Sequence, residues 1–328
     1  MRALVTGGAG FIGSHLTEAL LAAGHEVAVL DDLSTGRLEN LAAVDGEPGL
    51  TVTVGTIRDE PLVRKLVSSA DVVFHLAAAV GVRLILERPV ETIETNVVGT
   101  EVVLRAAAET GARVVIASTS EVYGKSARVP LAEDDDRLLG PTSKSRWSYA
   151  CAKAMDEFLA LAYHQERGLD CVIVRLFNTV GPRQSGQYGM VVPRFVGRAL
   201  AGAPIEIHGD GRQTRCFCHV ADTIRALEGL MDARELSGEI FNVGSTQRIS
   251  ILDLADRVRE LTESSSELAF VPYERVYEQG IEDMLHRIPS IAKIGDAIGW
   301  RPRLDLERIL ADTVAFARAR VPLESGAS

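Results

Sequence analysis

Near its N-terminus the chain reads Thr6-Gly7-Gly8-Ala9-Gly10-Phe11-Ile12-Gly13, directly after the short apolar run Ala3–Thr6. Gly7 permits a tight turn, Gly10 lets the backbone approach a pyrophosphate, and Gly13 lets a helix pack closely on the strand. The helix that begins here would present unpaired N–H groups and the positive end of its dipole to phosphates. The stretch therefore predicts a dinucleotide site made of a strand, a turn and a helix.

An acidic residue supports this prediction and indicates which dinucleotide binds. Asp31 follows Gly13 by 18 residues and stands at the end of the second apolar run, Val27–Leu30. A carboxylate at this place can accept a hydrogen bond from the 2′-hydroxyl of a ribose, and it repels a 2′-phosphate. We therefore expect NAD rather than NADP.

The apolar pattern of the first 176 residues indicates the fold class. Short apolar runs, apolar on both faces, alternate with longer amphipathic stretches, which is typical of parallel strands covered by helices on both sides. The runs are Ala3–Thr6, Val27–Leu30, Leu50–Val54, Val72–Leu76, Val114–Ser118 and Cys171–Leu176, and the amphipathic stretches are 12–23, 59–69, 90–110 and 149–167. The sequence predicts an α/β fold with a doubly wound parallel sheet.

The pattern becomes less regular after residue 177, where Gly and Pro are frequent and the candidate elements are shorter. We predict an NAD-binding Rossmann-type domain over residues 1–177 and a smaller, irregular α/β domain for a nucleotide sugar over 178–328. Residues 216–244 are expected to return to the first domain, with Phe217–Val220 and Ile240–Val243 as strands of the main sheet.

Composition excludes several classes of function. The 328 residues carry a net charge of −10, whereas a nucleic-acid binder needs clustered Lys and Arg. The four cysteines form no C-x-x-C pair, none lies near a histidine at zinc-ligand spacing, and no metal site is predicted. Apolar runs are too short to span a membrane, and the first residues already read as a strand rather than a signal peptide, so we expect a cytoplasmic protein.

A tyrosine and a lysine supply the candidate chemistry. In Tyr149-Ala150-Cys151-Ala152-Lys153 the phenol and the ammonium stand at i and i+4, on one face of a helix. A free tyrosine titrates at about pH 10, and a nearby ammonium together with an oxidised nicotinamide would lower that pKa. The pair Y-x-x-x-K is also common on exposed helix faces. In this chain the glycine turn lies upstream of the pair, and a strand end with hydroxyl groups, Ser118-Thr119-Ser120, lies between the turn and the pair. Both features favour a catalytic role for Tyr149 and Lys153.

Several motifs in this order resemble the extended short-chain dehydrogenase/reductase family, which includes the nucleotide-sugar epimerases and dehydratases. The resemblance covers nearly the whole chain. It rests on the glycine turn, Asp31-Asp32-Leu33-Ser34-Thr35-Gly36, His75-Leu76-Ala77-Ala78, Asn96-Val97-Val98-Gly99-Thr100, the Tyr149/Lys153 pair and Gly209-Asp210-Gly211. One departure is Thr56, because relatives usually carry Asp before the isoleucine, so we expect a rearranged contact with adenine and Ile57 over the ring.

The resemblance implies the residues that hold NAD. They are Gly7, Gly10, Phe11, Ile12, Gly13, Asp31, Asp32, Ser34, Thr35, Gly36, Thr56, Ile57, Leu76, Ala77, Ala78, Asn96 and Lys153. Lys153 would bond the nicotinamide ribose. Tyr149 would take the proton from the sugar O4 while hydride leaves C4, and Thr119 would bond the same hydroxyl.

The resemblance also implies a UDP-sugar substrate. The residues expected to contact it are Val80, Arg83, Asn178, Arg183, Arg215 and Arg287. Arginine suits the diphosphate because its planar fork bonds phosphate oxygens in pairs. In addition, the family pairs the helices that correspond to 90–110 and 149–167 across a two-fold axis, which implies a homodimer.

Residues after Thr119 bear on the fate of the 4-keto sugar. The 4,6-dehydratases carry Asp-Glu there, whereas this chain has Ser120-Glu121, which disfavours dehydration. Thr119–Gly124 and His286–Ser290 resemble UDP-glucuronate decarboxylases, in which the Ser, the Glu and the C-terminal Arg flank the leaving carboxylate. In contrast, Ala79–Arg83 and Gly181–Gln184 resemble UDP-glucuronate 4-epimerases.

The direction of Glu121 decides whether it repels a sugar carboxylate or serves the loop backbone, and the sequence leaves that open. Our first hypothesis is a UDP-glucuronate 4-epimerase. The second hypothesis is a UDP-glucuronate decarboxylase, and the third and least favoured of these enzymes is a sugar-nucleotide 4,6-dehydratase. A non-catalytic NAD-dependent sensor is disfavoured because Tyr149 and Lys153 are both present.

Overall fold

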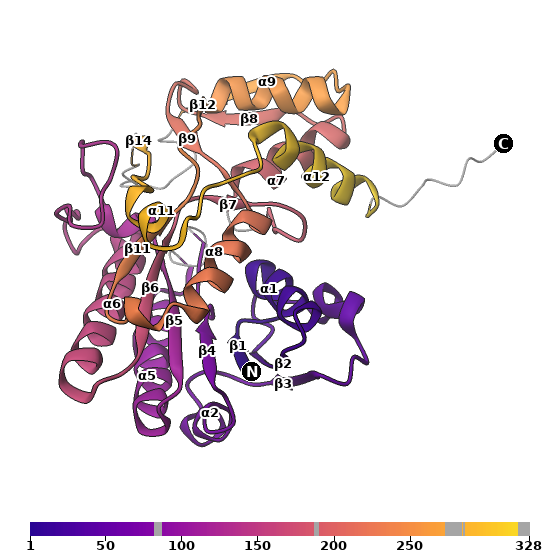
Figure 1. The fold of residues 1–328 in the computed structure, drawn as a ribbon. Helices are drawn as coiled ribbons and strands as arrows, with labels where there is room; N and C mark the ends of the chain where they lie inside the picture. Colours follow the sequence, from indigo (N-terminus) through magenta and orange to yellow (C-terminus); the bar gives the residue numbers. More distant parts are fainter. Residues whose placement is uncertain (82–86, 187–189, 273–283, 285, 321–328) are drawn as a thin grey trace.

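The described residues form a seven-stranded parallel sheet, as the sequence predicts. The computed structural model describes residues 1–81, 87–186, 190–272, 284 and 286–320 (Figure 1). The strand order is β11-β6-β5-β4-β1-β2-β3. The strands are β1 (Arg2–Thr6), β2 (Glu26–Asp31), β3 (Leu50–Val54), β4 (Val72–His75), β5 (Arg113–Thr119), β6 (Cys171–Leu176) and β11 (Ile240–Val243).

Helices cover both faces of this sheet, as expected from strands that are apolar on both sides. The helices are α1 (Phe11–Ala22), α2 (Glu60–Val67), α4 (Pro89–Ile93), α5 (Gly99–Thr110), α6 (Ser148–Arg167) and α8 (Val220–Asp232), with one π-helical turn, η2 (Glu94–Val98). α1 and α8 share one apolar cluster with the sheet, and α2, α5 and α6 contribute to the other. Each layer thus buries its apolar stripe against the central strands of the sheet.

One predicted strand differs from the others in its environment. β3 lies at the edge of the sheet, and Val52 and Val54 are 39% and 59% exposed. The expectation that all the early strands are covered on both faces is therefore wrong for β3. A strand at the edge has a neighbour on one side only, and less of its surface is covered.

Smaller elements lie at one end of the molecule, beyond the main sheet (Figure 1). They are β7 (Thr179–Val180), α7 (Val191–Leu200), β8 (Ile205–His208), β9 (Thr214–Cys216), β10 (Cys218–His219), β12 (Arg248–Ser250), α9 (Ile251–Thr262), β13 (Leu268–Val271), β14 (His286–Arg287) and α12 (Leu306–Arg318). In contrast, α11 (Ala292–Ile298) packs against β11 of the main sheet. Helices α7, α9 and α12 share an apolar cluster that is separate from those of the main sheet. This cluster supports the division after residue 177, which we retain as a proposal.

The two segments expected to rejoin the main sheet behave differently. Ile240–Val243 does so as β11, which pairs with β6. The expectation for Phe217–Val220 is wrong, because Cys218 and His219 form β10, which pairs with β7 in a small separate sheet. The helix α8 begins at Val220 and returns the chain to the face of the main sheet, where it packs beside α1.

Candidate active site

A cavity of about 670 Å³ lies at the carboxyl ends of the sheet strands and reaches from the glycine turn to Tyr149. Ligands in open α/β sheets bind at this edge. Most of the predicted cofactor residues line the cavity. They are Gly7, Gly10, Phe11, Ile12, Gly13, Asp31, Asp32, Ser34, Thr35, Ile57, Leu76, Ala77 and Ala78.

The glycine turn has the close backbone packing that its sequence predicts. Gly7 adopts a φ of +73°, in the left-handed region that favours glycine. A Cβ on Gly13 would lie 2.1 Å from the carbonyl oxygen of Gly7, so this position admits no side chain. The cavity is lined by Gly7 and Gly10 of the turn and by the first residues of α1, Phe11 and Ile12. These residues therefore fit a dinucleotide pyrophosphate.

Asp31 lies beside this turn and is 7% exposed. Its two carboxylate oxygens accept hydrogen bonds from the backbone N–H groups of Ala9, at 2.9 Å, and Leu33, at 2.8 Å. Burial raises the pKa of Asp31, although these backbone bonds act in the opposite direction. The carboxylate thus ties the end of β2 to the glycine turn, and Asp31 also lines the cavity.

Three predicted cofactor residues, Asn96, Gly36 and Thr56, are not among the described residues that line the cavity, but they lie beside residues that do or in the same loops. The side-chain amide of Asn96 bonds the backbone N–H and carbonyl of Ala79, at 2.9 and 3.1 Å, and so fixes the loop after β4. Gly36 stands behind Asp31, where a Cβ would lie 2.7 Å from a carboxylate oxygen. The hydroxyl of Thr56 accepts a hydrogen bond from its near neighbour, the backbone N–H of Arg58, at 3.3 Å.

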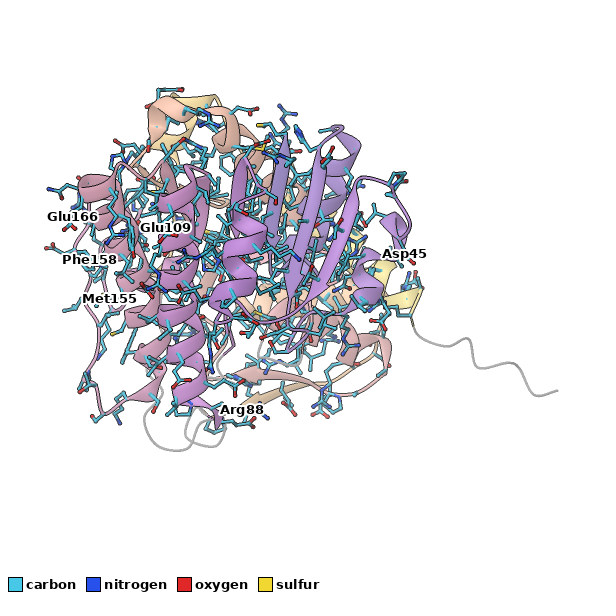
Figure 2. All side chains as sticks on the ribbon, turned by 90° about the horizontal axis from the view of Figure 1, so that it is seen from below. Asp45, Arg88, Glu109, Met155, Phe158 and Glu166 are labelled. Carbon is cyan, nitrogen blue, oxygen red and sulfur yellow. The ribbon has the colours of Figure 1, made fainter. Side chains whose placement is uncertain are left out.

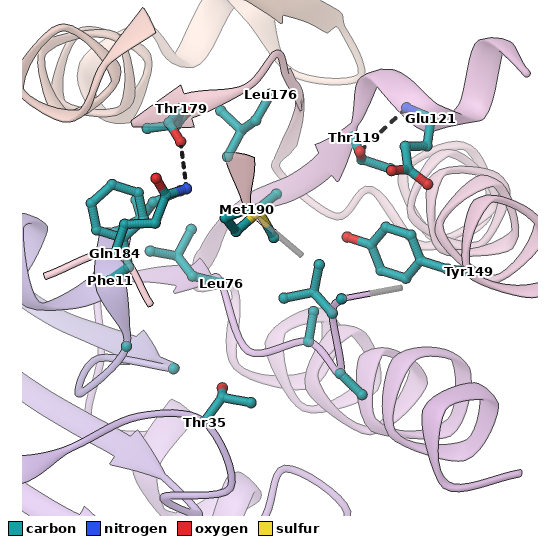
Figure 3. A pocket seen from close by; sticks show the side chains of 18 of the residues that line it. Phe11, Thr35, Leu76, Thr119, Glu121, Tyr149, Leu176, Thr179, Gln184 and Met190 are labelled. Atoms are coloured by element: carbon teal, nitrogen blue, oxygen red, sulfur yellow. Dashed lines mark hydrogen bonds between the residues drawn. The ribbon is translucent and has the colours of Figure 1, made fainter. Parts of the chain in front are cut away.

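The tyrosine of the predicted pair faces the cavity. Figure 3 shows the Tyr149 hydroxyl directed into the pocket, below Thr119 and Glu121. Thr119 ends β5 and caps the short helix η3 (Ser120–Tyr123), because its hydroxyl accepts a hydrogen bond from the backbone N–H of Glu121 at 3.3 Å. Ser120 also lines the cavity and is 1% exposed. The predicted hydroxyl-bearing strand end thus lies beside the phenol.

Lys153 does not act on the phenol as the sequence predicts. Its ammonium donates to Asp156 Oδ2 at 2.8 Å, and the two side chains are 2% and 0% exposed. Burial raises the pKa of Tyr149, and the negative charges of Glu121 and Asp156 raise it further, against the opposing effects of Arg146 and Thr119. The expected lowering of this pKa by Lys153 is therefore wrong in this state, since Asp156 binds the ammonium. Within the described lining, Lys153 is absent.

Glu121 is held between two arginines. Arg146 Nη1 donates to Glu121 Oε2 at 2.5 Å, and Arg287 Nη1 lies 3.5 Å from Oε1. Burial opposes ionisation of Glu121, but Arg146, Arg287 and then Arg215 outweigh it and hold its pKa below the usual range. The sequence leaves the direction of Glu121 open, and in the structure its carboxylate is directed at two guanidinium groups. The neighbouring guanidinium groups thus favour the ionised form of Glu121.

The two arginines predicted to bind the diphosphate lie close to Glu121. Arg215 on β9 and Arg287 on β14 are register partners on neighbouring parallel strands, and both line the cavity. Asn178 and Val80 line it as well. The prediction for Arg183 is not supported, since its guanidinium bonds Glu18 at 2.6 Å and Ser14 at 3.3 Å and ties the loop after β7 to α1. Arg83 lies outside the described residues.

Sequence reasoning missed several residues of the lining. They are Arg146, Thr179, Gln184, Met190, Val192, Arg194, His208, Gln213, Phe217 and Ile251, among others. Arg146 lies in the short helix η4 (Ser145–Trp147), three residues before Tyr149, and proximity to the predicted tyrosine was the one available signal. The remaining residues come from short elements after β6, where the sequence has no strong motif.

Two further findings concern the described part of the chain. No group of three or more His, Cys, Asp or Glu side chains is arranged there to hold a metal ion. His75, for example, is buried between the hydroxyls of Thr6 and Thr100, at 2.9 and 3.0 Å, and burial lowers its pKa to about 3. None of the described helices has the length and apolar character needed to cross a membrane.

Fold and site together define an α/β enzyme with a dinucleotide cradle that opens onto Thr119 and the buried Tyr149. The model of the NAD dependent epimerase/dehydratase family matches residues 3–244, and the chain belongs to this family. NAD is therefore its cofactor, as the sequence predicts. The fold is that of the extended short-chain dehydrogenase/reductases.

Individual relatives carry more specific names. The chain is 43% identical over 318 residues to the UDP-N-acetyl-alpha-D-glucosaminuronate decarboxylase of Bacillus cytotoxicus, which covers 97% of this chain and 98% of the relative. It is 36% identical to UDP-glucuronic acid decarboxylase 1 of Arabidopsis thaliana, over 98% of this chain and 71% of the relative. The UDP-glucose 4-epimerase of Thermotoga maritima, solved with UDP-glucose, gives a TM-score of 0.87 at 31% identity, covering 97% of this chain and 99% of that one.

Proposed function

We propose that this protein is an NAD-dependent decarboxylase of a UDP-linked hexuronic acid. The observation that carries the proposal is the surroundings of Glu121, where Arg146, Arg287 and Arg215 outnumber one carboxylate. Such a site favours a negatively charged sugar over a neutral hexose. The two curated decarboxylases named above support the same assignment, because both names describe enzymes of nucleotide-linked uronic acids.

The proposed reaction begins at the sugar O4. The ionised phenol oxygen of Tyr149 would take the O4 proton and become a hydroxyl, and the Thr119 hydroxyl would orient O4. Bound NAD would lie along the glycine turn, accept hydride from C4 and return it at the end of the turnover, and its positive ring would favour the ionised phenol.

The C4 ketone then makes the substrate a β-keto acid. The bond between C5 and C6 breaks, carbon dioxide leaves, and the electron pair forms an enolate across C5 and C4. A proton returns to C5, and reduction at C4 gives a UDP-pentose. No net oxidant is needed, because the hydride removed at the start is returned. Asp156 would have to release Lys153 for the lysine to reach the nicotinamide ribose, as the resemblance implies.

Support for the 4-epimerase expected from the sequence is weaker. A 4-epimerase of a uronic acid must keep the C5–C6 bond intact in the keto sugar. In addition, the epimerase structure named above is 31% identical to this chain, whereas the decarboxylase from Bacillus cytotoxicus is 43% identical. A 4,6-dehydratase remains disfavoured, because Ser120 stands where those enzymes place the Asp that helps expel the C6 hydroxyl. The decarboxylase therefore replaces the epimerase as our leading proposal.

Product analysis tests this function directly. Purified protein, loaded with NAD, is incubated separately with UDP-N-acetylglucosaminuronate, UDP-glucuronate and UDP-glucose. We expect one or both uronates to release carbon dioxide in amounts equal to the UDP-pentose formed, and UDP-glucose to release none. A C4-epimerised uronate with all six sugar carbons retained would contradict the proposal and restore the epimerase. The products are separated by chromatography and identified by mass.

We further propose that two copies associate through α4, α5 and α6, as the family resemblance implies. Apolar side chains are exposed along this side of the molecule, namely Val90 (68%), Ile93 (44%), Val98 (49%), Met155 (48%) and Phe158 (55%). Figure 2 shows Met155 and Phe158 projecting from the outer side of α6. A second copy would remove these side chains from water, which is the usual reason for a patch of this kind.

Charge placed in this patch is expected to separate the subunits. We predict that Phe158→Glu converts a dimer into a monomer at micromolar concentration, because a buried unpaired carboxylate at the interface is costly. Light scattering coupled to gel filtration measures the mass. Phe270→Glu is the matched control, since Phe270 on β13 is equally exposed, at 54%, and lies outside this patch. A wild-type monomer, or the same dimer in both variants, would show that this interface is wrong.

A further inference from the structure

Arg146 is the least expected charged residue of the site. It belongs to η4, immediately before α6, and only 5% of its side chain is exposed. Its guanidinium lies 5.6 Å from the centroid of the neighbouring Trp147 ring, and Trp147 is itself 1% exposed. Trp147 packs in an apolar cluster with Val122, Ala150 and Phe177. The turn that presents Tyr149 to the cavity therefore also holds Arg146 in place.

The contact of Arg146 with Glu121 is the closer of the two arginine contacts. The distance is 2.5 Å for Arg146, against 3.5 Å for Arg287. The contacts also involve different carboxylate oxygens, Oε2 for Arg146 and Oε1 for Arg287. Glu121, Arg146 and Arg287 all line the cavity. Removal of Arg146 would leave one Glu121 oxygen without its closest cation, next to the space that the sugar enters.

We propose that Arg146 is a specificity-determining residue, which neutralises Glu121 so that the cavity admits a sugar that carries a carboxylate. The inference deepens the proposed function and rests on it for the identity of the sugar. A Glu121 that has lost its closest cation keeps the more distant Arg287 beside it and would repel an incoming carboxylate more strongly. A neutral hexose would be affected far less. Arg146 acts through Glu121 and sets which sugar binds.

Binding rather than turnover provides the test. Dissociation constants of UDP-glucuronate and UDP-glucose are measured by calorimetry on NAD-loaded protein that carries Tyr149→Phe, so that no substrate is consumed. The two ligands differ in one group, a carboxylate in place of a hydroxymethyl, so their ratio isolates the effect on the carboxylate. We expect Arg146→Gln to reduce the preference for UDP-glucuronate by about tenfold or more, with a smaller change for UDP-glucose.

Two more variants separate charge from folding. Glu121→Gln combined with Arg146→Gln removes both charges and is expected to recover most of the lost preference, and Arg146→Lys, which keeps the charge, is expected to retain part of it. Equal weakening of both ligands by Arg146→Gln would overturn the inference, and so would a double variant no better than the single one. If the native enzyme releases no carbon dioxide but the binding ratios behave as expected, the proposed reaction fails while the role of Arg146 stands.

Discussion

Replacing Tyr149 with phenylalanine is expected to reduce turnover by roughly 10³-fold or more while NAD remains bound. The substitution removes the proton acceptor for the sugar O4, and a positioned acid–base group commonly contributes about 10²–10⁴ in rate. Tyr149 lies on α6 and does not belong to the glycine turn, so the substitution leaves the dinucleotide cradle intact. Steady-state release of carbon dioxide and the NAD content of the purified variant are the two measurements.

Tyr163→Phe is the matched control for this experiment. Tyr163 lies on the same helix, α6, and does not belong to the described lining of the cavity. Removal of its hydroxyl should leave turnover within about twofold of the native enzyme, since substitutions away from special features have small effects. Turnover near the native value in Tyr149→Phe would show that another group takes the proton.

The second large effect is expected at the glycine turn. Gly13→Ala places a methyl group 2.1 Å from the Gly7 carbonyl oxygen, and the backbone of Gly8 is also within 3 Å, so α1 must move away from the turn. Overpacking of this kind costs about 1–3 kcal/mol of stability. If the displaced turn loses about 2.7 kcal/mol of the binding free energy of NAD, the affinity falls roughly a hundredfold. We expect a lower melting temperature, measured by thermal unfolding, and an affinity for NAD that is roughly a hundredfold weaker, measured by equilibrium dialysis.

Gly197→Ala provides the comparison. Gly197 is a helical glycine in α7, and a Cβ there would meet no atom within 4 Å. Alanine favours the helix over glycine by about 0.5–1 kcal/mol, so this variant should be as stable as the native protein or slightly more so, with unchanged NAD binding. Native NAD affinity in Gly13→Ala would show that the turn has more freedom than its contacts indicate.

The sequence was sufficient for the main sheet because its signals are local. The glycine turn, the alternation of apolar runs with amphipathic stretches and the acid after β2 all depend on residues close together in the chain. The environment of β3 and the position of β10 could not be predicted in this way. They depend on which strands become neighbours, and the strand order brings together segments that lie far apart in the sequence.

The site shows the same limit at the level of single side chains. The motifs correctly indicated that Thr119 and Tyr149 meet at the cavity. They gave no warning that Asp156 binds Lys153, because an acid three residues further along a helix is usually a surface feature. Arg183 pairs with Glu18, which lies 165 residues away, and Arg146 pairs with Glu121 from a separate turn. Ion pairs of this kind depend on the tertiary fold.

The pairing of β14 with β9 has a consequence for how sugar preference changes in such enzymes. Arg287 reaches the cavity from β14, beyond residue 244, where the match to the family model ends. The glycine turn and the Thr119 strand end are complete well before that point. A substitution in β14 therefore changes one arginine beside Glu121 and leaves the glycine turn and the Thr119 strand end as they are. The charge around the sugar is thus divided between two distant segments of the chain, Arg146 before α6 and Arg287 on β14.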